Sequence, residues 1–74
     1  MRFALPEMSG RQVVKVLERA GFSIISIKGS HAKLRHDRMG QTAIVPLHKS
    51  LKRGTRASIL RQAGMDAQSF VKLL

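Results

Sequence analysis

The residue of this chain best suited to chemistry is a histidine that opens an alternating segment. His31 begins the run HAKLRH, in which polar and apolar residues alternate. Alternate side chains of a β-strand share a face, so His31, Lys33 and Arg35 are expected to point away from the core. Ala32 and Leu34 are expected to point into it. Cations next to an imidazole favour its neutral form, and a neutral base flanked by positive charge suits a polyanionic substrate.

The three residues before this histidine complete the segment. Lys28 adds another cation, and Gly29-Ser30 is a turn signal that places His31 at the start of its strand. A solvated basic strand with an incidental histidine has the same appearance, and from this segment alone that interpretation is the better one. The function therefore has to be argued from the whole chain.

A second candidate site lies where a helix is expected to begin. The segment Lys52-Arg53-Gly54-Thr55-Arg56 contains three cations, with Thr55 as the expected helix cap. Free backbone N–H groups and the helix dipole favour an anion at such a position. A solvated basic loop is the alternative. The basic balance of the chain favours phosphate binding by Lys52, Arg53, Thr55 and Arg56.

The other two histidines are weaker candidates. His36 has the core-facing parity of its strand, which favours a half-buried structural role. His48 follows Pro46 by two residues in a basic loop and could reach a phosphate. A metal site built from all three histidines is disfavoured, because their spacing is not a recognised one, cations surround them and carboxylates are scarce. We expect neither a metal nor another cofactor.

Charge is the outlying property of the composition. The 74 residues include 14 Lys and Arg against 4 Asp and Glu, a formal net charge of +10, while the hydrophobic fraction of 43% is that of a globular protein. This balance points to nucleic acid as the partner, ahead of an acidic protein or an anionic membrane. A membrane surface ranks last, because Trp and Tyr are missing and the cations are spread over several elements.

Length and cysteine content set further bounds. Residues 1–74 are expected to form one small domain with a thin core. The absence of cysteine excludes disulfides and thiolate metal sites. The first ten residues lack the apolar run of a signal peptide, and no segment approaches transmembrane length. We therefore expect a reducing, cytoplasmic setting.

The elements that position the candidate residues begin with a helix. Ser9 is expected to be its N-cap, with Gln12 at the capping-box position, and Gly21 is placed to end it. An apolar stripe with helical spacing consists of Val13, Val16, Leu17 and Ala20.

Three strands are expected next, over residues 22–28, 31–37 and 41–46. Short turns join them, so they form an antiparallel meander. The adjacent Ile24 and Ile25 break the alternation of the first strand and indicate a bulge or burial on both faces.

A basic loop over residues 47–54 leads to two further helices. The second helix is expected to begin at Thr55 and to stop at Gly64, and Asp66 is expected to cap a short last helix. The turn between them is also compatible with a helix-turn-helix DNA-binding regulator, but a last helix this apolar is suited to packing. The apolar residues of the two helices are Ile59, Leu60 and Ala63, and Phe70, Leu73 and Leu74.

The expected order is therefore α-β-β-β-α, an α+β fold with a three-stranded antiparallel sheet. Both main helices should cover one face of the sheet and leave the other bare. Double-stranded RNA-binding domains use this order, and they hold phosphates with a basic cluster at the start of the second main helix.

Nearly the whole chain resembles the HicA family of toxin–antitoxin mRNA interferases. Each matching segment is unspecific alone, and their combination in one order carries the resemblance. The segments are Leu5-Pro6, Ser9-Gly10, residues 17–22, 28–31 and 34–36, Val45-Pro46 with His48, Gly54-Thr55, and residues 59–64. The resemblance implies a fold like that of double-stranded RNA-binding domains, ribonuclease activity with His31 as the catalytic residue, and inhibition by a HicB-type antitoxin.

Cleavage of RNA without a metal would use His31 to take the proton of the 2′-hydroxyl. The residue that protonates the departing oxygen stays open between His36, His48 and water. A non-catalytic RNA-binding module of the same fold is the alternative function, and a DNA-binding regulator is a third. The residues expected to support His31 and stabilise the phosphate are Lys28, Gly29, Ser30, Lys33 and Arg35.

Overall fold

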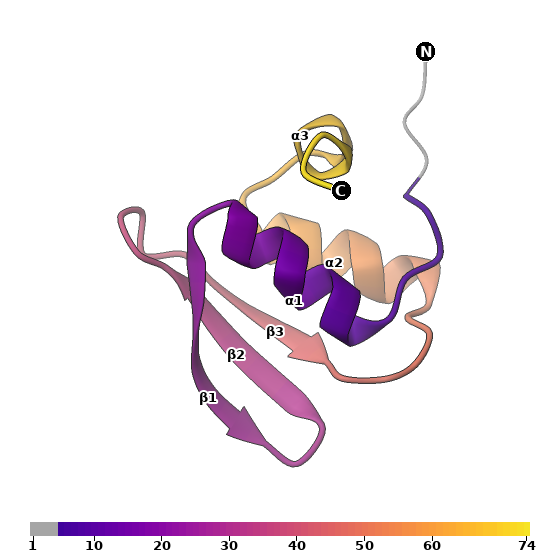
Figure 1. The fold of residues 1–74 in the computed structure, drawn as a ribbon, viewed down its shortest axis with the longest axis horizontal. Coiled ribbons are helices and arrows are strands. Elements are labelled where there is room, and N and C mark those ends of the chain that lie inside the picture. The colour runs from indigo at the N-terminus through magenta and orange to yellow at the C-terminus, as the bar shows by residue number, and fades with distance from the viewer. Residues whose placement is uncertain (1–4) are drawn as a thin grey trace.

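The structure, a computed structural model, describes residues 5–74. Three antiparallel strands in the order β1-β2-β3 carry two long helices on one face, as Figure 1 shows. The predicted α-β-β-β-α order and α+β class are confirmed. The elements are α1 (Gly10–Arg19), β1 (Phe22–Lys28), β2 (His31–His36), β3 (Thr42–Pro46), α2 (Arg53–Ala63) and the short α3 (Ala67–Val71).

Two features of the sequence stabilise helix α1: side chains that cap its first turn, and apolar residues on the face that packs into the core. The Ser9 side chain accepts a hydrogen bond from the N–H of Gln12 (3.2 Å), and the Gln12 side chain accepts one from the N–H of Ser9 (2.9 Å). The predicted capping box is therefore present. The chain leaves the helix through Gly21, whose φ of +102° suits a residue without a side chain. The buried residues of the helix are Gly10, Val13, Val14, Val16 and Leu17.

The register of the sheet separates a core face from an exposed face. Ala32 pairs with Val45, and Leu34 pairs with Ala43. All four side chains are fully buried and belong to one core shared with α1 and α2. The residues of β2 that alternate with Ala32 and Leu34, namely His31, Lys33 and Arg35, are exposed. The two helices therefore cover one side of the sheet, and the side that carries His31 is open to solvent.

The strands differ from the sequence predictions only in detail. The register of β1 against β2 shifts at Ile25, so the bulge indicated by the adjacent isoleucines is present. The second strand ends at His36 and the third begins at Thr42, one residue inside each predicted bound. The turn between them accounts for this difference, because the N–H of His36 already bonds to the carbonyl of Gln41 (2.8 Å).

The prediction that Thr55 caps α2 is wrong. The helix begins at Arg53, its N-cap Lys52 contributes no side-chain hydrogen bond, and Thr55 lies within the first turn. Tertiary contacts set this earlier start, because the buried Leu51 is fixed by a hydrogen bond from its N–H to the carbonyl of Met8 (2.9 Å). The predicted apolar side of α2 is confirmed, since the buried residues are Ile59, Leu60 and Ala63.

Helix α3 closes one end of the core. Asp66 caps it as predicted, since its side chain accepts a hydrogen bond from the N–H of Ser69 (2.7 Å). Phe70 is buried and Leu73 packs at the edge of the core. Leu74 was expected on the same apolar side, but it lies beyond the helix and is 54% exposed.

No helix within residues 5–74 combines the length and the apolar character needed to cross a membrane.

Candidate active site

His31 is exposed and lies in a row of paired residues that crosses all three strands. The register pairs it with Lys28 on β1 and with Pro46 on β3. Paired residues of antiparallel strands share a face, so Lys28 stands directly beside the imidazole. Lys33 and Arg35 are exposed on the same side further along β2, as the alternation predicted. We call this side of the sheet, with Lys28, His31, Lys33 and Arg35, the outer face.

Gly29 and Ser30 form the turn that places His31 at its strand end. Gly29 has a φ of +56°, a left-handed conformation that glycine adopts without strain, and the space around its Cα is open. The carbonyl of Ser30 accepts a hydrogen bond from the N–H of Leu47. The turn therefore sets the start of β2 and also anchors the loop that follows β3.

The structure brings a second histidine to the same row. The ring centroids of His31 and His48 are 6.2 Å apart, their planes meet at 72°, and both residues are exposed. From sequence alone His48 was a weak candidate, because the course of the chain after β3 was not known. The sequence feature that could have predicted this pairing is Pro46 at the end of the third strand. When residue 46 pairs with His31, residue 48 also comes close to His31.

Backbone contacts hold the loop that carries His48. The backbone carbonyl of His48 accepts a hydrogen bond from the N–H of Gly10 (2.9 Å) at the start of α1. Gly10 is buried against this loop, where a Cβ would lie 2.8 Å from the Cα of Leu47 and closer still to the carbonyl oxygen of Pro46. A residue without a side chain lets α1 approach this closely, so the position of His48 depends on Gly10.

The predicted basic cluster lies on the other side of His48. Lys52 and Arg53 are exposed there, and Thr55 is half-buried. The first N–H groups of a helix have no intrahelical acceptor and can hold an anion. The cluster and the outer face therefore meet at His48. A hollow of about 270 Å³ lies beside His48 and is lined by Pro46, His48, Ser50, Leu51, Lys52 and Thr55.

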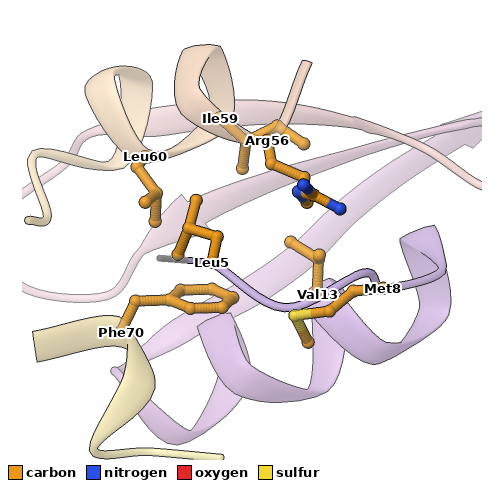
Figure 2. A pocket seen from close by; sticks show the side chains of 7 residues that line it. All are labelled: Leu5, Met8, Val13, Arg56, Ile59, Leu60 and Phe70. Carbon is orange, nitrogen blue, oxygen red and sulfur yellow. The ribbon is translucent and has the colours of Figure 1, made fainter. Parts of the chain in front are cut away.

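Arg56, predicted as a member of this cluster, is set apart from it. Its side chain is half-buried and donates a hydrogen bond from Nη1 to the carbonyl of Leu51 (3.3 Å), while its buried Nε has no partner among residues 5–74. Figure 2 shows the guanidinium pointing towards Val13 and Met8 across a small cavity. These contacts fix the start of α2 from inside the fold.

His36 has a structural position that occupies its ring. Its Nε2 lies 3.0 Å from the carbonyl oxygen of Ala20, and its Nδ1 accepts hydrogen bonds from the N–H groups of Arg38 (3.1 Å) and Met39 (3.0 Å). This pattern fits the tautomer with the proton on Nε2. As strand parity predicted, His36 is half-buried and points away from the outer face, so it is poorly placed to exchange a proton near His31.

Two of the carboxylates, Asp37 and Asp66, have partners away from His31. Asp37 accepts a hydrogen bond from the hydroxyl of Ser23 (2.8 Å) at the far end of the sheet. Asp66 caps α3, and the hydrogen bond from the backbone N–H of Ser69 lowers the pKa of Asp66 below its ordinary value of 3.8. Within residues 5–74, no three His, Cys, Asp or Glu side chains gather in a group that could hold a metal ion.

A comparison with protein families gives a match over most of the chain. The family model described as the HicA toxin of bacterial toxin–antitoxin systems matches residues 10–65. The match runs from the start of α1 to just beyond α2, so it includes His31, His48 and the basic start of α2. A search of curated proteins found no match.

Proposed function

The chain belongs to the HicA toxin family and is a toxin of a toxin–antitoxin system, and on this premise we propose that it is an endoribonuclease that cleaves mRNA. The observation that supports this proposal best is the exposed imidazole of His31. It stands beside Lys28 on a bare sheet face, at the end of a strand whose other outward side chains are cations. A polyanion can lie along such a face with its backbone next to a base.

His31 acts as the general base in this proposal. In its neutral form it accepts the proton of the 2′-hydroxyl, whose oxygen then attacks the adjacent phosphorus. Lys28 stands next to His31 and is positioned to counter the charge that grows on the phosphate oxygens, and Lys33 and Arg35 hold the neighbouring phosphates. The substrate supplies the nucleophile, so the reaction requires no metal-bound water.

The start of α2 extends the RNA path beyond His48. Lys52, Arg53 and Thr55, with the first N–H groups of the helix, bind phosphate without reading sequence. Replacing both Lys52 and Arg53 by alanine should weaken binding of every RNA to a similar degree. It should also reduce the salt dependence of binding by roughly one counterion for each phosphate that the variant no longer neutralises, and an unchanged salt slope would exclude this path.

A toxin–antitoxin family implies an antitoxin partner, and we propose that it is of the HicB type. With 14 cations against 4 carboxylates, the toxin attracts an acidic protein surface. The outer face is not covered by any element within residues 5–74. An antitoxin that carries acidic side chains onto this face would block the RNA and shield His31 at the same time.

The decisive assay incubates the purified protein with an unstructured RNA. We expect the parent protein to shorten the RNA and His31→Ala to lose about 100-fold or more of the rate, the usual contribution of a general base. Ser26→Ala is a matched control, because Ser26 is exposed on the outer face one row away and has no proposed role.

The possible results separate the two candidate functions. Circular dichroism and thermal melting of the variants establish that each is folded. A folded His31→Ala protein that cleaves as fast as the parent removes His31 from the mechanism. A parent protein that binds the RNA but leaves it intact indicates the alternative, a non-catalytic RNA-binding module.

A further inference from the structure

We propose that His48 is a second catalytic residue, the general acid that protonates the departing oxygen. This inference rests on the proposed ribonuclease function and adds to it the group that the sequence left open. The observation behind it is the pairing of two exposed imidazoles, with ring centroids 6.2 Å apart, at the end of a row of cations.

The separation of the two rings fits the geometry of the reaction. The attacking and departing oxygens of a phosphoryl transfer lie roughly in line on opposite sides of the phosphorus. A general base and a general acid must each come within hydrogen-bond reach, about 3 Å, of one of these oxygens. Two exposed rings 6.2 Å apart, one on β2 and one in the loop after β3, can meet this requirement at a single phosphate.

Backbone hydrogen bonds fix the segments that carry His31 and His48, and the two imidazole side chains stay exposed to substrate. The turn before His31 and the loop before His48 are joined by the hydrogen bond between Ser30 and Leu47. The carbonyl of His48 is fixed to the N–H of Gly10 (2.9 Å). A site held in this way is organised before RNA binds, which lowers the cost of bringing the two groups together.

The proton movements balance within the pair. Neutral His31 takes the proton from the 2′-hydroxyl as the bond from the 2′-oxygen to phosphorus forms. The bond from phosphorus to the 5′-oxygen breaks, and protonated His48 gives its proton to that oxygen. The products are a 2′,3′-cyclic phosphate and a 5′-hydroxyl. His31 ends protonated and His48 neutral, and exchange with water restores the starting forms.

The hollow beside His48 indicates which side of the scissile phosphate each part of the RNA occupies. His48 lies between His31 and the N-terminal turn of α2, and it lines the hollow there with Lys52 and Thr55. The departing 5′-oxygen belongs to the nucleotide on the 3′ side of the cut. The RNA downstream of the cut is therefore directed towards α2, and the upstream RNA lies over the outer face.

The test uses a substrate whose leaving group needs no acid. In an otherwise identical RNA, sulfur replaces the 5′-bridging oxygen at the scissile phosphate. A thiol, with a pKa of about 8.5, departs as its anion far more readily than an alcohol does. We expect His48→Gln to lose about 100-fold or more of the rate on ordinary RNA and to cleave the sulfur-containing RNA nearly as fast as the parent. His31→Gln should be slow on both substrates.

Each other outcome overturns the assignment. Equal losses of His48→Gln on both substrates would make His48 a binding or structural residue. Rescue of His31→Gln instead would exchange the two roles, and full activity of His48→Gln on ordinary RNA would remove His48 from the chemistry. Lys49→Ala, an exposed neighbour with no proposed role, controls for disturbance of the loop. A parent protein that cleaves while His48→Gln is unaffected refutes only this inference, whereas a parent that cleaves no RNA refutes the proposed function.

Discussion

Parity along one strand gives two histidines opposite roles. His31 and His36 both lie on β2, and because they are five residues apart they point to opposite faces. His36 meets the ring of Phe22 edge-on, with centroids 5.0 Å apart, and backbone groups occupy both of its ring nitrogens. His31 keeps an exposed ring that can receive substrate. The position on the strand, more than the residue type, decides which imidazole is available for chemistry.

Asp66 makes a prediction about stability in acid. The hydrogen bond from the backbone N–H of Ser69 lowers the pKa of Asp66 below 3.8. The folded state therefore stabilises the charged carboxylate of Asp66 relative to its protonated form. The stabilisation is present above the ordinary pKa and is lost as pH falls through the lower, folded value. Asp66→Asn keeps a good helix cap but cannot titrate.

Thermal melting from pH 7 to pH 2 measures this effect. The parent should lose stability relative to Asp66→Asn as the pH falls below about 4, while the other carboxylates titrate in both proteins. A difference in melting temperature that stays constant over the whole range would show that the charge on Asp66 does not contribute to the cap.

At the scale of elements, the site depends on how closely α1 approaches the loop after β3. Gly10→Ala should favour the helix by up to about 1 kcal/mol through intrinsic propensity. The added Cβ would overlap backbone atoms of Pro46 and Leu47, which cannot move aside as a flexible side chain would. The clash should dominate, with a net loss of about 1–3 kcal/mol of unfolding free energy and displacement of His48.

Urea unfolding and RNA cleavage together test this prediction. Gly54→Ala is the matched control for stability, because nothing lies within 4 Å of a Cβ at that position on α2. We expect Gly10→Ala to lower both stability and the cleavage rate of the folded protein, and Gly54→Ala to leave stability unchanged or slightly raised. A fully stable and active Gly10→Ala protein would show that the loop does not need this contact.

Local patterns predicted the elements better than the site. Alternation and capping signals are properties of neighbouring residues, so β2, the Ile25 bulge and the Ser9 cap could be predicted from sequence. The start of α2 could not, because the burial of Leu51 against distant residues overrides the local signal of Thr55. The pairing of His31 with His48 likewise depends on strand register and on two long-range backbone hydrogen bonds.

At the scale of the whole molecule, a net charge of +10 is carried by a thin body of 36 × 28 × 17 Å. Residues 5–74 form one sheet and one layer of helices, and within this part of the chain the side of the sheet opposite the helices stays open. This shape gives RNA and an acidic antitoxin the same surface to compete for. Inhibition should then follow from coverage alone, without a change in the fold of the toxin.

The absence of cysteine makes this coverage measurable. Single-cysteine variants Ser26→Cys, on the outer face, and Gln68→Cys, on α3, place one reactive thiol at exposed positions on different sides. Addition of the antitoxin should slow thiol labelling at position 26 and leave labelling at position 68 unchanged. Protection of position 68 alone, with position 26 still reactive, would place the antitoxin elsewhere.

The central claim, that His31 activates a nucleophile belonging to the RNA itself, is tested most directly by one substitution in the substrate. The cut site is first mapped with ordinary RNA, and cleavage is then measured in EDTA on an RNA with a single 2′-deoxynucleotide on the 5′ side of the scissile phosphate. The parent protein should cleave the ordinary RNA in EDTA to a 2′,3′-cyclic phosphate and a 5′-hydroxyl. It should bind the 2′-deoxy RNA through the same phosphates and leave it intact. Cleavage of the 2′-deoxy RNA, or loss of all activity in EDTA, would contradict the mechanism.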